Sequence, residues 1–286
     1  TGRYQYARQY ALRVYTESTG GRKECDCRKT FHGNSRARTG ISRPRSVQRA
    51  GYKRISEQAL GFGFLTVREI LNKGLLGRLV EFESTFPRYR NFIKPGTWKE
   101  TGELGGGLTY NLGAHIIDQA VQLLGVPDAV FADIDTIRTG GMVDDYFVIH
   151  LLRPSKAPRV KVTLKSSYLM CASEPRFVLH GREGSYVKYG FDPQEAALNE
   201  GVLPVTPHWG EEDKSSWGIL HTEKGGRIVH EPYPSLPGDY AAFYENIYRH
   251  ICHGEPLQSD AREVVGVIRL IEAGWESSRM QRVVRI

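Results

Sequence analysis

The sequence predicts an α+β fold, with a mostly antiparallel open sheet and helices on one of its faces. Runs rich in β-branched and aromatic residues predict strands at 79–86, 129–137, 146–152, 160–169, 177–180 and 185–189. Apolar residues recur at helical spacing over about 109–124, 239–253 and 260–279. Because several strands follow one another with no helix between them, they are expected to pair antiparallel in one sheet, with the helices packed against it.

The charge distribution divides the chain near residue 64. The 286 residues hold 39 Lys+Arg and 32 Asp+Glu, but residues 1–63 hold 14 and 4 of these (+10), which leaves 25 and 28 (−3) for residues 64–286. The first part has little apolar periodicity, whereas the second opens with apolar residues at helical spacing from Leu65 to Leu71, followed by Gly74. We therefore expect residues 1–63 to be basic and disordered and residues 64–286 to form the folded domain.

Composition excludes several classes of protein. No apolar run approaches the eighteen residues that a membrane span requires. The four cysteines are too few and too irregularly placed for a disulfide framework, and Cys25-x-Cys27 has no second pair at zinc-ligand spacing. No signal segment opens the chain. A protein of the reducing cytoplasm without a metal site is expected, and the stretch 193–217, rich in Pro, Gly and charge, is expected to be an excursion from the fold.

The stretch from Gly105 to Gly125 is the strongest candidate for chemistry. Four polar residues follow one another at spacings of four, three and four, which places them on one side of a helix: Asn111, His115, Asp118 and Gln122. The glycine-rich start would let another chain or a ligand approach the first helical turn closely. Two interpretations fit this spacing. One is a surface helix with its polar side in water, and the other is a histidine general base with a polar neighbour one turn away.

Several motifs resemble the substrate domain of the Gfo/Idh/MocA oxidoreductases, a family that includes glucose–fructose oxidoreductase and inositol dehydrogenase. They occur in family order and span residues 64–286 almost continuously: the helix motif from Gly105 to Asp118, the stretch from Phe177 to Gly190, Asp192-Pro193-Gln194-Glu195, and Tyr240 to Ile247. Asn111 stands where many family members have Asp, so the polar neighbour of His115 is uncharged here.

The resemblance implies an oxidoreductase that transfers a hydride between a sugar-like or polyol substrate and NAD or NADP. The catalytic candidates are His115, which would exchange the hydroxyl proton, and Asn111, which would orient it. The substrate-binding candidates are Arg88, Arg90, Lys94, Trp98 and Asp118, the last with a structural role as the alternative. Tyr168 and Tyr240 are expected to be packing residues. Sheet runs with apolar residues on both faces predict a homo-oligomer that assembles through the sheet.

The cofactor half of the family pattern is missing. Neither the Gly-x-Gly-x-x-Gly turn nor the Glu-Lys-Pro segment with its catalytic lysine appears, so no cofactor-binding residue can be assigned. When the codons of residues 1–63 are read one base later, they permit Rossmann-domain segments of the family in order, including EKPFT ending at the codon of His32. We interpret residues 1–63 as an out-of-frame remnant of the dinucleotide-binding domain, which makes the chain as written inactive.

Two alternatives have different consequences. The first 63 residues could be a genuine basic arm that binds nucleic acid or an acidic surface. A basic arm would have no reason to encode Rossmann-domain segments one base later, so nucleic acid is not the expected partner. The chain could also be a non-catalytic binding module that dimerises through its sheet. Binding of NAD(H) or NADP(H) by the purified chain separates this module from an enzyme.

The reading-frame interpretation can be tested on DNA. Raw reads across the locus should show the EKPFT text one base later, with a single insertion or deletion near the codon of Phe64. Stop codons in the alternative frame, together with peptides of residues 1–63 detected by mass spectrometry of the native protein, would show that the basic segment is genuine.

Overall fold

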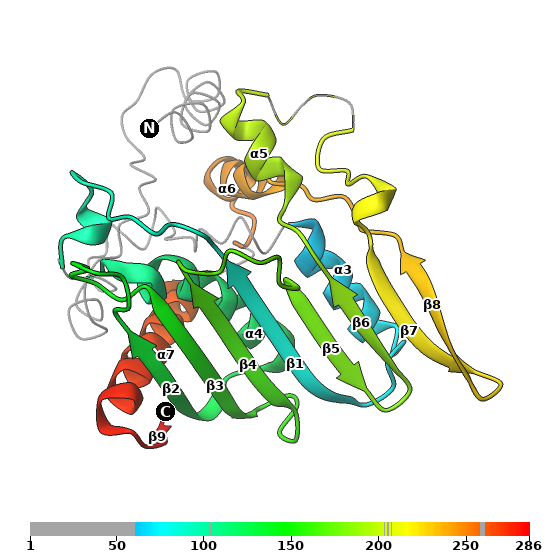
Figure 1. Cartoon of the computed structure of the whole chain (residues 1–286). Helices are drawn as coiled ribbons and strands as arrows, with labels where there is room; N and C mark the ends of the chain where they lie inside the picture. Colours follow the sequence, from blue (N-terminus) through cyan, green and yellow to red (C-terminus); the bar gives the residue numbers. More distant parts are fainter. Residues whose placement is uncertain (1–60, 103–104, 203, 205, 207, 258–260) are drawn as a thin grey trace.

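A computed structural model describes residues 61–102, 105–202, 204, 206, 208–257 and 261–286 (Figure 1). The helices are α3 (Phe62–Asn72), α4 (Ala114–Leu124), α5 (Pro193–Asn199), α6 (Ala241–His253) and α7 (Ala261–Met280). The strands are β1 (Leu79–Pro87), β2 (Pro127–Asp135), β3 (Tyr146–Pro154), β4 (Lys161–Ser167), β5 (Phe177–Gly181), β6 (Gly184–Lys188), β7 (Gly218–Lys224), β8 (Arg227–Tyr233) and β9 (Val284–Arg285). Short helical turns are η2 (Trp98–Glu100), η3 (Thr109–Gly113) and η4 (Lys214–Ser216).

The strands form a single open sheet in the order β8-β7-β6-β5-β1-β4-β3-β2-β9. Among these described strands, β1 and β4 make the parallel pair and every other neighbouring pair is antiparallel. Helices α3, α4 and α7 lie behind the sheet in Figure 1, and the described part of the chain places no helix over its front. The predicted α+β class, with a mostly antiparallel open sheet and helices on one face, is confirmed.

The hydrophobic core lies between the sheet and these three helices. Alternate residues of β3 are fully buried, such as Phe147 and Ile149, and they face helix residues such as Ile116 and Ile271, which are also fully buried. Burying each such side chain stabilises the fold by roughly 1.5–3 kcal/mol. The intervening residues of each strand point to the uncovered side, which we call the open face. This packing fixes the sheet and α4, and so fixes the edge where the candidate residues lie.

The structure differs from the sequence prediction at α3, at α5 and at both ends of the sheet. Helix α3 begins at Phe62, two residues before the expected boundary, because the Phe62 ring is buried under the Lys188 ammonium at 4.7 Å. The excursion at 193–217 contains a helix, α5, which Asp192 caps by accepting from the main-chain N–H of Gln194. Strands β7 and β8 at one end of the sheet and the short β9 at the other were not predicted. The rest of residues 1–63, including Cys25 and Cys27, lies outside the described residues.

None of the helices in the described segments combines the length and the apolar character needed to cross a bilayer.

Candidate active site

The candidate site lies at the edge of the sheet where β1 and β4 end (Figure 1). Because these two strands are parallel, their carboxyl ends meet at the same edge, with Pro87 opposite Ser167. The segments that follow them leave the sheet together, and a bridge between Tyr89 and Leu169 joins them. The η3 turn contacts β4 and continues into α4, which carries His115. The fold therefore brings the glycine-rich motif and the loop after β1 to one edge.

Asp144 fixes the start of this helix. Its main-chain oxygen accepts from the Leu108 N–H at 2.9 Å, and its Oδ2 accepts from both the N–H and the hydroxyl of Thr109 at 2.6 Å. Gly107 has a φ of +85°, and a Cβ at this position would lie 1.8 Å from Asp144 Oδ1. Only glycine therefore allows this approach. The group that reaches the glycine-rich start is a carboxylate of the same chain, rather than the ligand or second chain that the sequence suggested.

Burial gives Asp144 an unusual pKa. Loss of solvent raises the pKa of this carboxyl to about 6, although the hydrogen bonds from Thr109 oppose the rise. The carboxylate lies at a helix start, where the backbone N–H groups and the helix dipole favour negative charge. The anion-binding capacity of this helix start is therefore already used by Asp144.

The first turn of the predicted helix is π-helical, a feature found frequently at functional sites. Asn111 in η3 and His115 in α4 are both half-buried. Asp118 is only 1% exposed, and its Oδ2 accepts from Gln122 Nε2 at 3.0 Å. The interpretation of this stripe as a solvated surface face is therefore wrong at Asp118, whose burial and helical bond suit a structural role better than contact with substrate.

Asn111 is held by two neighbours. Lys99 Nζ donates to Asn111 Oδ1 at 2.9 Å, and a second hydrogen bond joins the side chains of Asn111 and Tyr168. An amide whose oxygen accepts from an ammonium has its NH₂ group left to donate, so the contact with Lys99 sets the orientation of Asn111. No sequence pattern singles out Lys99 beyond its position next to Trp98.

Tyr168 contributes more than packing. It is 6% exposed, as expected for a packing residue, and burial raises the pKa of its hydroxyl. The guanidinium groups of Arg138 and Arg90 lie 4.6 Å and 5.5 Å from its ring centroid, distances typical of cation–π contacts. The ring thus gives Arg90 a fixed position at the site, while the hydroxyl reaches Asn111. Tyr240, the other expected packing residue, is also 6% exposed.

A buried ion network holds the loop after β1. Arg138 bonds Glu100 and Asp145, each at 2.8 Å, and its NH1 donates to the Phe92 main-chain oxygen at 2.6 Å. The side chains of Arg138 and Asp145 are 2% and 0% exposed. The sequence gives no sign of this network, since its three charged side chains lie outside the strands and the long helices and are separated by seven to 45 residues. The network fixes the η2 turn, and with it Trp98 and Lys99.

The structure separates the residues predicted to bind substrate into those near Asn111 and those away from it. The Arg90 guanidinium packs on the ring of Tyr168, which bonds Asn111. Trp98 lies next to Lys99, whose Nζ is 5.9 Å from the indole centroid. Arg88 points elsewhere, because its guanidinium stacks on Phe191 at 4.8 Å and lies 3.9 Å from the Glu195 carboxylate. Lys94 is exposed in the loop after β1. Arg90 and Trp98 are therefore placed with Asn111, whereas Arg88 is not.

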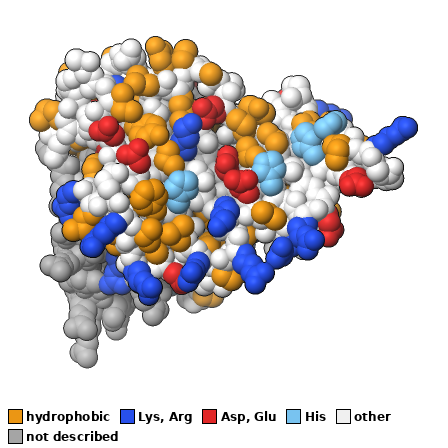
Figure 2. All heavy atoms as spheres, turned by 60° about the horizontal axis from the view of Figure 1, so that its bottom comes forward, with side chains coloured by type: hydrophobic (Ala, Val, Ile, Leu, Met, Phe, Trp, Pro, Cys, Tyr) orange, Lys and Arg blue, Asp and Glu red, His pale blue; other side chains and the backbone are white. Residues whose placement is uncertain are grey.

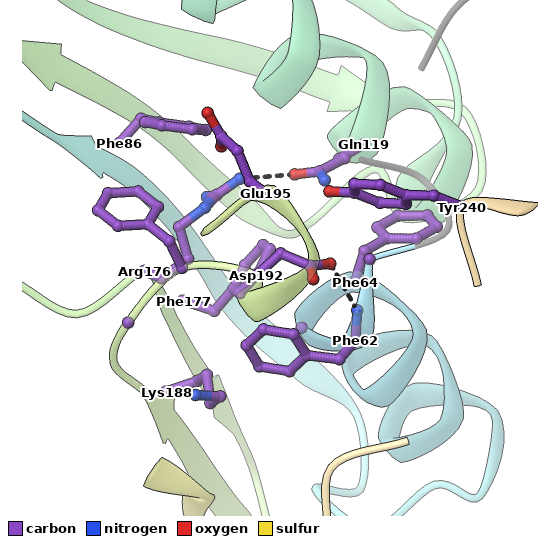
Figure 3. A pocket seen from close by; sticks show the side chains of 14 residues that line it. Phe62, Phe64, Phe86, Gln119, Arg176, Phe177, Lys188, Asp192, Glu195 and Tyr240 are labelled. Atoms are coloured by element: carbon purple, nitrogen blue, oxygen red, sulfur yellow. Dashed lines mark hydrogen bonds between the residues drawn. The ribbon is translucent and has the colours of Figure 1, made fainter. Parts of the chain in front are cut away.

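A small cavity lies between α3, the sheet and the start of α5, away from the candidate site (Figure 3). Arg176 crosses it, packs on Phe177 at 4.4 Å and donates to Gln119 Oε1 at 2.8 Å, and burial lowers the pKa of its guanidinium to about 9. Asp192 accepts from the N–H of Phe62 at 3.2 Å. The cavity holds only about 40 Å³, which is room for a few water molecules but not for a sugar. Its groups anchor α3 to the sheet.

Comparison with known proteins identifies the family. The model of the C-terminal alpha/beta domain of the GFO/IDH/MocA oxidoreductase family matches residues 68–286. The chain belongs to the Gfo/Idh/MocA family. This agrees with the resemblance inferred from the motifs and with the observed fold.

Its Gfo/Idh/MocA relatives are longer proteins. The uncharacterized oxidoreductase C115.03 of Schizosaccharomyces pombe is 36% identical over 237 residues, which cover 78% of this chain and 64% of that protein. The scyllo-inositol 2-dehydrogenase (NADP(+)) IolW of Bacillus subtilis is 34% identical, over 78% of this chain and 61% of its own. The crystal structure of an oxidoreductase from Bacteroides fragilis is 56% identical and has a TM-score of 0.73, with 81% and 65% covered. The chain thus spans just under two thirds of each relative.

In this Gfo/Idh/MocA chain, we expect Asp144 to make stability depend on pH. The folded protein holds the Asp144 proton up to about pH 6, whereas the unfolded chain releases it near 3.8. The free energy of unfolding therefore falls as pH rises between these values. The shift of about two pKa units corresponds to roughly 3 kcal/mol.

The Asp144→Asn variant tests this dependence, because the amide oxygen can still accept from Thr109 but the side chain cannot titrate. Urea denaturation at pH 4 and pH 7 should show a smaller loss of stability in Asp144→Asn than in the wild type. Asp133→Asn, on the exposed side of β2, is the matched control and should follow the wild type. Parallel pH dependence in all three proteins would contradict the assignment.

Proposed function

We propose that the complete protein, with its reading frame restored upstream of Phe64, is an NAD(P)-dependent oxidoreductase acting on an alcohol of a sugar-like or polyol substrate. The proposal rests chiefly on the convergence of His115, Asn111 and the loop after β1 at one sheet edge, in a chain of this oxidoreductase family. The relative IolW is a scyllo-inositol 2-dehydrogenase (NADP(+)), which supports a polyol substrate. The free cysteines Cys171 and Cys252 agree with a reducing, cytoplasmic location.

The described residues do not fit a dinucleotide. Its pyrophosphate needs backbone N–H groups at a helix start behind a glycine-rich turn. The glycine-rich start in this chain is filled by the Asp144 carboxylate, which would repel a phosphate. We therefore assign cofactor binding to the missing upstream half, and expect the chain as written to bind neither NAD(H) nor NADP(H) and to be inactive.

The contacts at the edge support the following assignment of roles. His115 accepts the hydroxyl proton of the alcohol during oxidation and returns it during reduction. Asn111 orients that hydroxyl through its amide, which Lys99 holds by the 2.9 Å hydrogen bond. Arg90, stacked on Tyr168, and Trp98 bind the rest of the substrate. Lys99 is in this scheme a positioning residue for Asn111, and the ion network of Arg138 keeps its loop in place.

We expect His115→Ala in the complete protein to lose roughly 100- to 10,000-fold in turnover, which is the usual loss when a general base is removed. Cofactor affinity should stay near wild type, since His115 does not belong to the cofactor half. Steady-state kinetics with scyllo-inositol and related polyols, together with cofactor titration by fluorescence, measure both quantities. Alcohol oxidation requires a neutral imidazole, so the wild-type rate should rise with pH between about 5 and 8.

The matched control is His253→Gln, a change at an exposed histidine of α6. It should leave both turnover and the pH profile unchanged. If His115→Ala retains wild-type activity across this pH range, His115 is a structural histidine and the proposed catalytic role is wrong.

We further propose that a second copy of the chain covers the open face over strands β1, β4, β3 and β2. Apolar side chains such as Val148 and Phe131, which is 37% exposed, lie there among charged ones, including Glu83 and Lys165 (Figure 2). Neighbouring acidic and basic residues on adjacent strands let a copy of the same face pair with it in the opposite direction. A sheet with one face on helices and an apolar second face is usually covered on both sides.

Sedimentation velocity at micromolar concentration should therefore show a dimer. Val148→Asp places a charge on the open face without touching the core, and we expect it to shift the equilibrium strongly toward monomer while the circular dichroism spectrum is unchanged. Thr163→Asp, at a polar position of the same face, is the comparison variant and should shift the equilibrium toward monomer less than Val148→Asp does. A wild-type chain that sediments as a stable monomer would exclude this assembly.

A further inference from the structure

Three histidines lie in one row across the open face. His180 of β5 is directly opposite Ser185 of β6, Ser185 is opposite His221 of β7, and His221 is opposite His230 of β8. Their side chains therefore point to the same side of the sheet, and Figure 2 shows histidines on this side of the molecule. The two members on neighbouring strands, His221 and His230, can touch, whereas a whole strand separates His180 from them.

The rings of His221 and His230 converge on one point. Their Nδ1 atoms are 2.6 Å apart, the ring centroids are 4.6 Å apart, and the rings meet at 80°. At this distance one Nδ1 carries a proton and the other accepts it, so the two nitrogens share a single hydrogen. Replacing that proton with a metal ion would use the lone pairs of both rings. We propose that His221 and His230 form a bidentate site for a divalent transition metal ion that binds imidazole, such as Zn²⁺, Ni²⁺ or Cu²⁺.

The geometry requires little adjustment. Imidazole nitrogens bind zinc at about 2.0–2.1 Å, so two nitrogens at a tetrahedral angle are about 3.3 Å apart. The rings must separate by about 0.7 Å from their observed contact, which rotation of two surface side chains provides. Glu223, two residues along β7 and on the same face, adds an exposed carboxylate that favours a cation nearby.

The backbone holds the two histidines in place before any ion binds. Strands β7 and β8 are paired residue by residue from Gly218 opposite Tyr233 to Lys224 opposite Arg227. The two-residue turn between them, Gly225-Gly226, has positive φ at both positions, as tight hairpins require. Lys224 also pairs with Glu231 across the hairpin at 2.9 Å. The chelate is therefore preorganised, and binding does not need to order a loop.

The ligand type selects the metal. In the described part of the chain no group of three or more His, Cys, Asp or Glu side chains converges, so water must complete the coordination. A site with two imidazoles and water suits Zn²⁺, Ni²⁺ and Cu²⁺, and is a poor site for Mg²⁺ or Ca²⁺, which prefer oxygen ligands.

The test uses the full chain without a polyhistidine tag, stripped of metal by chelator and dialysis. Isothermal titration with NiCl₂ and ZnCl₂ should give one ion per chain, and MgCl₂ should give no heat of binding. His221→Gln and His230→Gln should each weaken binding at least about tenfold, because the remaining single ligand loses the chelate. The metal should also raise the melting temperature of the wild type and leave that of both variants unchanged, because it binds only the folded hairpin.

Two controls locate the site. His180→Gln removes a histidine of the same row whose Nδ1 contacts Ser185 Oγ at 2.8 Å, and His253→Gln removes an exposed histidine on α6. Both should bind metal as the wild type does, and all variants should match its metal-free melting temperature within a few degrees. Wild-type affinity in His221→Gln or His230→Gln, loss of binding in His253→Gln, or no wild-type binding at millimolar metal would each overturn the proposal.

Discussion

Two adjacent carboxylates, Asp144 and Asp145, hold the functional edge together. They directly precede β3, and neighbouring residues of an extended chain point to opposite sides. Asp144 therefore reaches the start of η3, where it accepts from Thr109, and Asp145 reaches Arg138, which binds Glu100 in the loop after β1. The two adjacent aspartates thus fix the positions of both the helical segment that carries Asn111 and the turn that carries Lys99.

This arrangement places charge where apolar packing cannot define a position. Removing an ion pair from water costs several kcal/mol per ion, so the Arg138 network is weak as a source of net stability. The network instead fixes the orientation of the loop after β1, because the Arg138 guanidinium bonds two carboxylates and a main-chain oxygen at once. The core under the sheet supplies the stability, and the polar edge supplies the precision that a reaction site requires.

Local patterns in the sequence predicted much of the fold and part of the site. Periodicity found α6 and α7 to within two residues, and the Gly105–Asp118 motif located the helix with Asn111 and His115. Strands β7 and β8 were missed because their residues are largely polar or charged. These strands form one end of the sheet, and most side chains of β8 are exposed. Lys99, Arg138 and Asp145 were missed for a different reason: their meaning lies in contacts between loops distant in sequence, and no spacing rule encodes such contacts.

The parallel pairing of β1 with β4 also constrains how the domain is made. Glu81 lies opposite Lys161, and the other neighbour of β1 is β5, which begins at Phe177, so both partners of the first strand come at least 80 residues later. Contacts of such long range slow folding, since a large loop must close before they form. During synthesis β1 must wait unpaired until β4 and β5 emerge from the ribosome. Both strand partners of β1 lie downstream of it, so every pairing of the described sheet is encoded from Leu79 onward.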